Sequence, residues 1–179
     1  NLAVGGTGKT PMTEYLVSLL SAQYKVAVLS RGYGRKTRGF RLANQDDTAY
    51  TIGDEPLQIH RRFPDVPVAV CADRVRGVKR LQQLFPGLQC VILDDAYQHR
   101  KIRCGFYVLL TPYQCLYVHD HMLPWGFLRD VPSQSHRANV IVVTKCPSDM
   151  QAIHRRIVSN ALQLPSYQQL SFSSIAYEP

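Results

Sequence analysis

The amino-acid sequence predicts an α/β protein with a mostly parallel sheet and helices on both faces of that sheet. Short, continuous apolar runs such as "KVAVLS" (25–30) and "NVIVVT" (139–144) are typical of strands that are buried on both sides. Segments with helical spacing of apolar residues separate these runs, and this alternation requires crossover connections between parallel strands. The 179 residues have the length of one ordinary domain, so we expect a single domain over 1–179.

Further apolar runs and helical patterns complete this order. Strands are expected at 66–71, 90–95 and 106–111. The first helix should bury one apolar face, formed by Met12, Tyr15, Leu16, Leu19 and Leu20. A second helix is expected from about Asp54, and a third follows Asp73, whose carboxylate can cap it. The apolar positions of the third helix are Val75, Val78, Leu81 and Phe85. Those of a last helix are Ile153, Ile157, Val158, Ala161 and Leu162.

The segment 112–138 has the least regular pattern, because Pro112, Pro124, Gly126 and Pro132 interrupt it. We expect this segment to leave the sheet. Loops positioned by a rigid scaffold often carry binding residues, so we also expect it to carry substrate contacts.

The composition excludes several protein classes. With 45% hydrophobic residues the chain can bury a real core, which excludes a disordered protein. It contains no run of the roughly 18 apolar residues that a membrane-spanning helix needs. The five cysteines form no C-x-x-C pair, which favours reduced, buried thiols over a disulfide framework or a metal site.

Basic residues gather in "RGYGRKTRGFR" (31–41), within a chain of net charge +8. The five cations of this segment are Arg31, Arg35, Lys36, Arg38 and Arg41. Such a segment attracts anions: the phosphates of a nucleotide, of a nucleic acid or of a lipid head group. A basic loop that is merely solvated is the alternative.

The stretch "NLAVGGTGKTP" places a glycine-rich loop between an expected strand and the first helix. It fits the phosphate-binding pattern G-x-x-x-x-G-K-[ST] except that Ala3 stands at the first glycine position. The loop would bind a nucleotide through Gly5, Gly6, Thr7, Gly8, Lys9 and Thr10. Lys9 would reach the β- and γ-phosphates, and the Thr10 hydroxyl would ligate Mg²⁺.

Several side chains are candidates for the chemistry beside this loop. Asp94 and Asp95 end the apolar run "CVIL", where an acid often holds the Mg²⁺ of a nucleotide, and the choice between them stays open. In "GDEP", Asp54 could orient an acceptor hydroxyl or simply cap a helix. His99, beside Gln98, is the other candidate.

Two further motifs bear on the substrate. Arg129 in "LPWGFLRD" could bridge phosphates or form a surface salt bridge. "VIVVTKCPSD" resembles the T-K-x-D strand end that reads guanine in GTPases, but Pro147 stands at the Asp position. Proline cannot accept the guanine N–H bonds, which argues against GTP, although Lys145 could still pack near a nucleotide.

Seven motifs occur in an order that resembles one enzyme family. They are "VGGTGKTP", "LSRGYGRK", "GDEP", "ADRV", "LDDAYQHR", "LPWGFLRD" and "VIVVTK". Together they resemble the tetraacyldisaccharide 4'-kinase (lipid A 4'-kinase) family over residues 1 to about 146. The resemblance implies a P-loop kinase domain that uses ATP and Mg²⁺. It further implies phosphorylation of the 4'-hydroxyl of a tetraacyldisaccharide 1-phosphate, at the cytoplasmic face of the bacterial inner membrane.

The resemblance also implies roles for the candidate residues. Asp54 would be the catalytic base, with Glu55 beside it in the acceptor or metal network. Asp94 and Asp95 would serve the Mg²⁺ shell. The remaining contacts to phosphate or to the lipid substrate would come from Arg129, Arg31, Tyr33, Gln98 and His99.

The sequence departs from the family pattern at several places. Trp125, Phe127 and Asp130 stand where Ala, Pro and Glu are expected, which affects the expected substrate contacts. We find neither the family's N-terminal membrane helix nor its late Asp-His-His segment. We therefore expect the chain to be a fragment that lacks both ends of the family's proteins.

Two functions of other classes remain as alternatives to the kinase. One is a P-loop GTPase or ATPase that acts as a switch or metallochaperone and hydrolyses its nucleotide. The other is a nucleic-acid-binding module that uses the 31–41 segment, which would leave the phosphate loop unexplained, so no nucleic-acid partner is expected. The sequence leaves the oligomeric state open.

Overall fold

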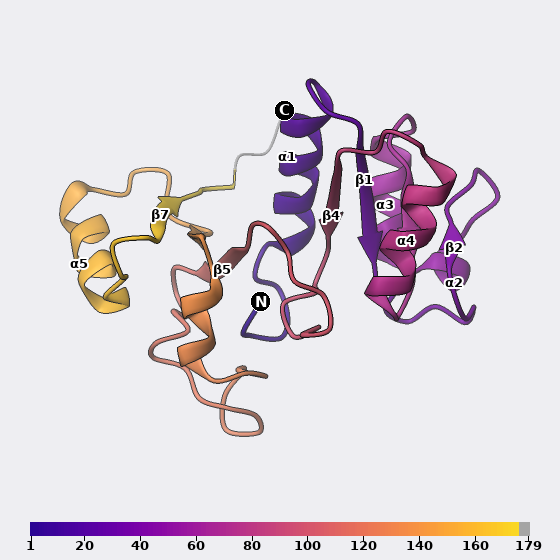
Figure 1. Cartoon of the computed structure of the whole chain (residues 1–179). Helices are drawn as coiled ribbons and strands as arrows, with labels where there is room; N and C mark the ends of the chain where they lie inside the picture. The colour runs from indigo at the N-terminus through magenta and orange to yellow at the C-terminus, as the bar shows by residue number, and fades with distance from the viewer. Residues whose placement is uncertain (176–179) are drawn as a thin grey trace. The chain divides into compact units, whose positions relative to one another are not determined.

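The computed structural model describes residues 1–175, which form two compact units (Figure 1). We call Lys9–Arg103 the four-stranded unit. The three-stranded unit combines Asn1–Gly8 with the chain from Cys104 onward. The expectation of one domain over 1–179 stays a prediction.

The four-stranded unit is built around a mainly parallel sheet of order β2-β3-β1-β4. Its strands are β1 (Val26–Ser30), β2 (Arg41–Leu42), β3 (Val68–Val70) and β4 (Cys90–Leu93). β1 pairs in parallel with both β3 and β4, whereas the edge strand β2 runs antiparallel to β3. The helices of the unit are α1 (Lys9–Ser21), α2 (Ala49–Ile52), α3 (Asp54–Arg62) and α4 (Arg74–Leu84).

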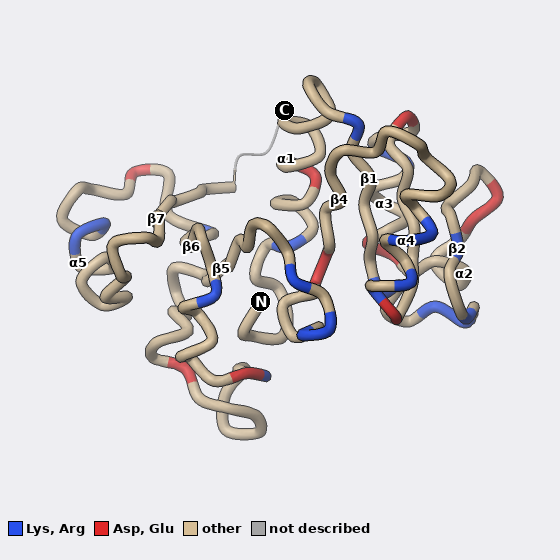
Figure 2. The backbone as a smooth tube through the Cα atoms, viewed as in Figure 1, with Lys and Arg blue, Asp and Glu red and all other residues tan. Residues whose placement is uncertain are grey.

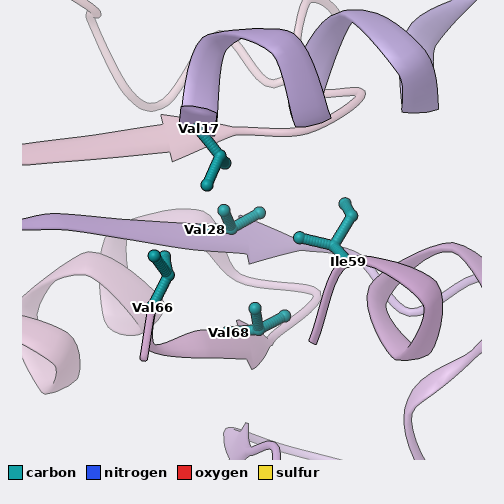
Figure 3. Close-up of a cluster of buried hydrophobic side chains, with 5 residues drawn as sticks. All are labelled: Val17, Val28, Ile59, Val66 and Val68. Atoms are coloured by element: carbon teal, nitrogen blue, oxygen red, sulfur yellow. The ribbon is translucent and has the colours of Figure 1, made fainter. Parts of the chain in front are cut away.

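Helices cover both faces of this sheet, as the sequence predicts. Val28 of β1 packs with Val17 of α1 and Ile59 of α3 on one face (Figure 3). The adjacent residue Leu29 points to the opposite face, where it packs with Leu81 of α4. Successive side chains of a strand point to opposite faces, so every residue of β1 is buried and the strand reads as a continuous apolar run.

The three-stranded unit contains a parallel sheet of order β5-β6-β7. Its strands are β5 (Val108–Pro112), β6 (Val140–Thr144) and β7 (Gln169–Phe172). A 3₁₀ helix, η1 (Pro132–Arg137), precedes β6, and α5 (Ala152–Leu162) follows it. Segment 112–138 is otherwise irregular after β5 ends, as expected, and its role in substrate binding stays a prediction.

Two expected helix faces were wrong in part. In α1 the buried residues are Thr13, Glu14 and Val17, while Tyr15 and Leu19 are exposed. The reason is that the Glu14 carboxylate turns inward and accepts hydrogen bonds from Gln58 (2.8 Å) and Arg62 (2.7 Å), both on α3.

In the last helix, Val158 and Leu162 are buried as expected, but Ile153 and Ile157 are exposed. The expected strand before the glycine-rich loop is also reduced to one isolated bridge between Ala3 and Leu128. All five cysteines are free, as expected, although Cys115 is exposed.

Candidate functional site

The glycine-rich loop has a backbone that its sequence explains. Gly5 and Gly8 have φ angles of 79° and 85°, a conformation that favours glycine. A Cβ atom at Gly6 would lie 3.5 Å from the Lys145 Nζ, so this ammonium group lies beside the loop. Helix α1 begins at Lys9, directly after the loop, and its first N–H groups have no intrahelical partner. These are the features of an anion-binding loop.

Two residues that the sequence did not single out hold this loop in place. The Thr144 hydroxyl, at the end of β6, donates to the Thr7 carbonyl oxygen (3.0 Å). The buried Asn1 side chain donates to the Thr7 hydroxyl and accepts from the Leu110 N–H (3.0 Å) on β5. The loop is therefore fixed to two strands by neutral hydrogen bonds. The position of Thr144 at a strand end was the only sequence signal for this role.

In the four-stranded unit, the acidic pair follows the carboxyl end of β4. Asp94 is 4% exposed, and its carboxylate accepts from the Ser30 hydroxyl (3.2 Å) at the end of β1. Burial raises the pKa of Asp94, and the charges of Glu55 and Asp95 raise it further, while Ser30 and Lys9 lower it. The fold therefore brings together Lys9, Glu55, Asp94 and Asp95, which lie far apart in the sequence.

Arg74 supports the acidic pair from within the protein. It is 2% exposed, and its guanidinium donates to the carbonyl oxygens of Cys71 (2.6 Å) and Asp94 (3.1 Å). It thereby ties the carboxyl ends of β3 and β4 together. Burial lowers the pKa of Arg74, and the Asp94 charge opposes this effect. Its Nε has no hydrogen-bond partner within residues 1–175.

The donor set at this strand end fits Mg²⁺ bound together with a nucleotide. Within residues 1–175, no three His, Cys, Asp or Glu side chains group closely enough to hold a metal by themselves. A nucleotide-bound Mg²⁺ does not need such a group, because phosphate oxygens and water complete the shell around one or two carboxylates. The adjacent carboxylates of Asp94 and Asp95 are donors of that kind.

Asp54 does not cap the helix it begins. The N-cap of α3 is Gly53, with a φ of 94°, and Asp54 is the first helical residue, with Glu55 next to it. The capping interpretation of Asp54 was therefore wrong. Its side chain is exposed, which leaves it accessible to another molecule.

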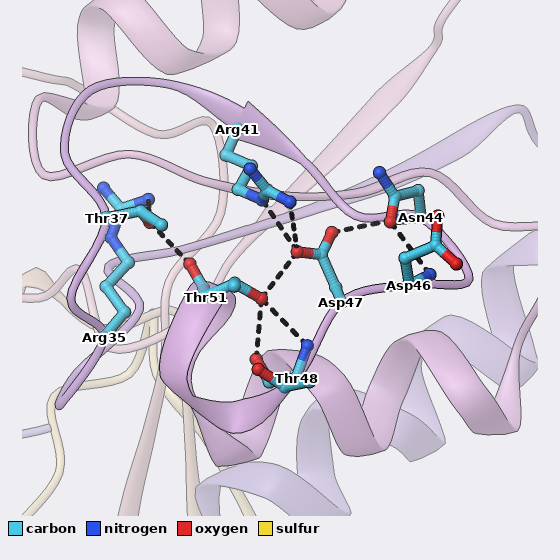
Figure 4. A network of polar contacts seen from close by, with 8 residues as sticks. All are labelled: Arg35, Thr37, Arg41, Asn44, Asp46, Asp47, Thr48 and Thr51. Carbon is cyan, nitrogen blue, oxygen red and sulfur yellow. Dashed lines mark hydrogen bonds and ion pairs between the residues drawn. The ribbon is translucent and has the colours of Figure 1, made fainter.

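The basic 31–41 segment is held against α2 by hydrogen bonds (Figure 4), and its binding of anions stays a prediction. Arg41 pairs with the buried Asp47 at 2.7 Å, and Arg35 donates to the Gly39 carbonyl oxygen at 2.7 Å. The Lys36 N–H donates to the Tyr50 carbonyl oxygen of α2 (2.7 Å). Two of the five cations therefore stabilise the segment itself. The other three, Arg31, Lys36 and Arg38, have exposed side chains.

Two glycines allow this segment to approach the start of α3. A Cβ atom at Gly32 would lie 2.8 Å from the Ile52 carbonyl oxygen. A Cβ atom at Gly53 would lie 2.8 Å from the Tyr33 carbonyl oxygen. The close approach places Tyr33 beside the residue that precedes Asp54.

An open basic hollow lies on the same unit. Its volume is about 850 Å³, and it is lined by residues 38–40 and by the exposed side of α4. The cations around it are Arg38, Arg76, Lys79 and Arg80. Figure 2 shows the corresponding blue stretches along α4 and in the segment after β1.

The remaining predicted site residues lie in two places. Gln98 and His99 follow the acidic pair in a turn where the His99 N–H donates to the Ala96 carbonyl oxygen (2.9 Å). The Nε2 of His99 is buried without a hydrogen-bond partner in the described part of the chain. Arg129 belongs to the three-stranded unit, where its N–H donates to the Leu2 carbonyl oxygen (2.8 Å) and its Nε to that of Asn1 (3.3 Å).

Comparisons with known proteins agree with one another. A family model described as tetraacyldisaccharide-1-P 4'-kinase (LpxK) matches residues 1–174. The tetraacyldisaccharide 4'-kinase of Flavobacterium johnsoniae is 50% identical over 178 residues, which are 99% of this chain and 52% of that protein. The enzyme of the same name from Parabacteroides distasonis is 51% identical over 99% of this chain and 48% of its own length. The chain thus spans about half the length of the curated relatives it matches.

The structure is also similar to a crystal structure of LpxK from Aquifex aeolicus in complex with ATP. The TM-score is 0.72 at 34% identity, and the match covers 80% of this chain and 45% of that one. This similarity confirms the predicted fold class, an α/β fold of the P-loop kinase type.

Proposed function

Because the chain belongs to the tetraacyldisaccharide-1-P 4'-kinase family, we propose that it forms the nucleotide-binding part of a lipid A 4'-kinase. Such an enzyme is a phosphotransferase with an alcohol group as acceptor. It would transfer the γ-phosphate of ATP to the 4'-hydroxyl of tetraacyldisaccharide 1-phosphate. The observation that carries this proposal is the convergence of Lys9, Glu55, Asp94 and Asp95 directly after a phosphate-binding loop.

ATP would be held by the loop from Gly5 to Thr10. The left-handed glycines turn backbone N–H groups toward an anion, and the start of α1 adds its own N–H groups. Lys9 would neutralise charge on the β- and γ-phosphates. Its charge lowers the pKa of Asp94, which is consistent with a position near that carboxylate.

Mg²⁺ would be held by Asp94 or Asp95, by the Thr10 hydroxyl and within reach of Glu55. Once bound with ATP, Mg²⁺ supplies a positive charge that stabilises the phosphate oxygens during transfer. The residues of the chain would hold these oxygens in place. Arg74 and Ser30 keep the Asp94 side of the site fixed.

The acceptor hydroxyl would lie at the start of α3. In the proposed reaction its oxygen forms a bond to the γ-phosphorus, and the bond from that phosphorus to the β–γ bridging oxygen breaks. ADP leaves, and the hydroxyl proton passes to the Asp54 carboxylate. The exposed first-turn position of Asp54 supports this role, since the carboxylate is not used as a cap.

The phosphorylated sugar of the substrate would meet the basic side of the four-stranded unit. Arg31 and Tyr33 lie in the segment held beside Gly53, and the basic hollow offers further cations for a phosphate. Gln98 and His99 would contact the sugar. Arg129 would contact phosphate or developing charge from the three-stranded unit.

We place the reaction at the cytoplasmic face of the bacterial inner membrane, where a tetraacylated substrate would lie. This location is inferred from the family. None of the helices described in residues 1–175 has the length and apolar character needed to cross a bilayer. A nucleotide-hydrolysing switch or metallochaperone is not favoured, because the whole matched region belongs to the kinase family.

The test is phosphate transfer from labelled ATP to tetraacyldisaccharide 1-phosphate in detergent micelles, separated by thin-layer chromatography. It is run with this chain and with the protein extended to the length of its relatives. Asp54→Asn should lower turnover by at least about 10²-fold, the scale of one lost general base. Asp65→Asn, an exposed acid of the same unit, is the matched control and should leave turnover unchanged. Release of phosphate to water alone would contradict the kinase and favour the hydrolytic alternative.

A further inference from the structure

The basic hollow of the four-stranded unit lies between the segment before β2 and the outer side of α4. Residues 38–40 form one wall, and α4 with its N-cap Asp73 forms the other. β2 and β4 are the opposite edges of the sheet (Figure 1). The two strands between them, β3 and β1, separate these edges by roughly 14 Å, since neighbouring strands lie about 4.8 Å apart. The hollow is therefore a different place from the carboxylates that follow β4.

Both walls of the basic hollow are held in place by the fold. On the first wall, the Arg35 guanidinium donates to the Gly39 carbonyl oxygen (2.7 Å). The Thr37 hydroxyl donates to the Thr51 carbonyl oxygen (2.5 Å) of α2 (Figure 4). On the second wall, a Cβ atom at Gly77 would lie 2.7 Å from a methyl carbon of β1, so α4 packs directly on the sheet. The shape of the hollow is thus set by contacts within the unit.

The cations that line the basic hollow are not neutralised by acids of the protein. Arg76, Lys79 and Arg80 lie at positions i, i+3 and i+4 of α4 and share one face of the helix. Within residues 1–175, none of Arg38, Arg76 and Lys79 forms an ion pair. Arg80 donates to the neutral side chain of Gln83 (3.2 Å). Like charges at this spacing destabilise a helix, and a bound anion would remove the repulsion.

One acid, Asp73, also lines the hollow. Its carboxylate caps α4 by accepting from the Arg76 N–H (3.1 Å). This hydrogen bond lowers the pKa of Asp73, and the charges of His99 and Lys101 lower it further. Asp73 is therefore bonded to the backbone and lies near additional cations, so the hollow keeps a net positive charge.

The charge and the size of the basic hollow indicate a class of ligand. A phosphate monoester carries a charge of about −1.5 to −2 at pH 7, so the four cations match about two phosphate groups. The volume of about 850 Å³ lies in the upper part of the range for small-molecule sites and exceeds what one phosphate fills. Phe40 and Val75 add apolar surface for the remainder of a ligand.

We propose that the basic hollow binds a soluble compound with at least two linked phosphate groups, in addition to the nucleotide at the phosphate loop. The three cations of α4 would hold the phosphate oxygens from one wall, and Arg38 would hold them from the other. Arginine suits this role, because each guanidinium can donate two hydrogen bonds to one phosphate group.

This inference goes beyond the proposed function, in which the hollow offers cations to the phosphate of the substrate sugar. A soluble compound in the hollow would compete with that phosphate and would inhibit the proposed kinase. Only this consequence rests on the proposed function, because binding itself needs no phosphate transfer.

Calorimetric titration with sodium tripolyphosphate tests the proposal, without divalent metal and at an ionic strength of about 0.15 M, which screens general attraction. The phosphate loop also attracts this probe, so the titration uses Lys9→Ala, in which the loop has lost its cation. This variant should still bind one tripolyphosphate. Inorganic phosphate and glucosamine 1-phosphate, with one phosphate group each, should bind at least about tenfold more weakly.

Paired substitutions separate the hollow from the net charge of the unit. In the Lys9→Ala background, Arg76→Gln together with Lys79→Gln should weaken tripolyphosphate binding by at least about tenfold. Arg61→Gln together with Lys25→Gln removes the same two residue types from exposed positions that do not line the hollow. This control pair should bind as the background does. Circular dichroism of each variant checks that the fold is intact.

Three results would overturn the proposal. The first is the absence of tripolyphosphate binding in Lys9→Ala, which would place all binding at the phosphate loop. The second is an equal loss of binding in the control pair, which would mean that net charge alone attracts the probe. The third is equal affinity for glucosamine 1-phosphate, which would assign the hollow to a single sugar phosphate. The titration contains neither ATP nor an acceptor lipid, so its failure is distinct from failure of the kinase test.

Discussion

The phosphate loop and the acidic pair are stabilised in opposite ways. The loop is held by neutral groups: Asn1 bonds to Thr7 and to the middle of β5, and Thr144 bonds to Thr7 from the end of β6. The acidic pair instead buries charge, with Asp94 beside other carboxylates and the buried Arg74 behind it. Neutral hydrogen bonds hold a conformation at little electrostatic cost, whereas buried like charges destabilise a fold until a cation arrives. The comparison indicates that the loop already has its binding conformation. The buried carboxylates of the acidic pair instead destabilise the fold in the absence of a metal ion, and a bound cation would remove this destabilisation.

The largest effect is expected at Arg74, whose removal tests whether the buried charge supports the fold. Arg74→Met should lower the free energy of unfolding by about 3 kcal/mol, because the buried carbonyl oxygens of Cys71 and Asp94 lose their donor. Urea unfolding measures this change. Arg76→Met, an exposed position on the same helix, should change it by less than about 0.5 kcal/mol. A more stable Arg74→Met protein would place Arg74 among the destabilising charges.

Asp47 is a buried carboxylate that is compensated, so it should behave oppositely to Asp94. Burial raises the pKa of Asp47, but hydrogen bonds from Thr51 and Arg41 outweigh burial and hold the pKa below its usual value. Asp47→Asn should therefore cost about 1.5 kcal/mol at pH 7.

The sign of the pH dependence follows from this lowered pKa. The stabilisation by Asp47 is present above the unfolded-state pKa of about 3.9 and is lost as the pH falls through the folded-state pKa. Urea unfolding at several pH values should show the Asp47→Asn deficit shrinking below about pH 4. A deficit that stays constant into acid would mean that packing, not charge, makes Asp47 important.

Asp94→Asn tests directly whether the buried Asp94 charge destabilises the fold in the absence of metal. Without nucleotide or metal, the variant should be more stable than the unchanged chain by about 1 kcal/mol at pH 7, since one buried charge is removed. Thermal unfolding in EDTA measures the gain. The same variant should lose the extra stability that Mg²⁺ and ATP together give the unchanged chain. If Asp94→Asn is less stable in EDTA, the Asp94 carboxylate is a structural group.

The smallest effect is expected in the loop. Thr144→Val keeps the shape of the side chain but removes the donor to the Thr7 carbonyl oxygen, which should cost about 1 kcal/mol or less. The affinity for a fluorescent ATP analogue should fall about threefold, the equivalent of roughly 0.6 kcal/mol. Ser at position 144 retains the hydroxyl, so Thr144→Ser should bind the analogue as the unchanged chain does.

Much of the fold follows from local sequence. Continuous apolar runs predicted β1, β3, β4, β5 and β6, because a strand that is covered on both faces does not alternate between polar and apolar residues. Asp73 caps α4 as expected by accepting from the Arg76 N–H (3.1 Å). The face of α1 was mispredicted because Glu14 pairs with residues more than 40 positions away. β7 was missed because its burial alternates between exposed and half-buried positions.

The residues of the candidate site likewise divide into those that local sequence predicts and those that it does not. Residues that belong to a short sequence motif, such as Lys9, Asp54 and Asp94, could be identified from the sequence. Their supports could not, because Asn1 acts through Leu110 and Thr144 acts through Thr7, across more than 100 residues. Hydrogen bonds over such separations leave no periodicity in a single sequence. The roles of the named residues in catalysis remain predictions.

The contact between Gly32 and Gly53 has a consequence for how this region can vary. Each glycine faces a carbonyl oxygen next to the other, so a side chain at either position would separate the same two backbones. In a library of all single variants, the two positions should therefore tolerate the same narrow set of residues. A double variant should do little more harm than either change alone, because the first substitution already opens the contact. Both positions are therefore restricted by the same backbone contact, although neither residue contributes a functional group.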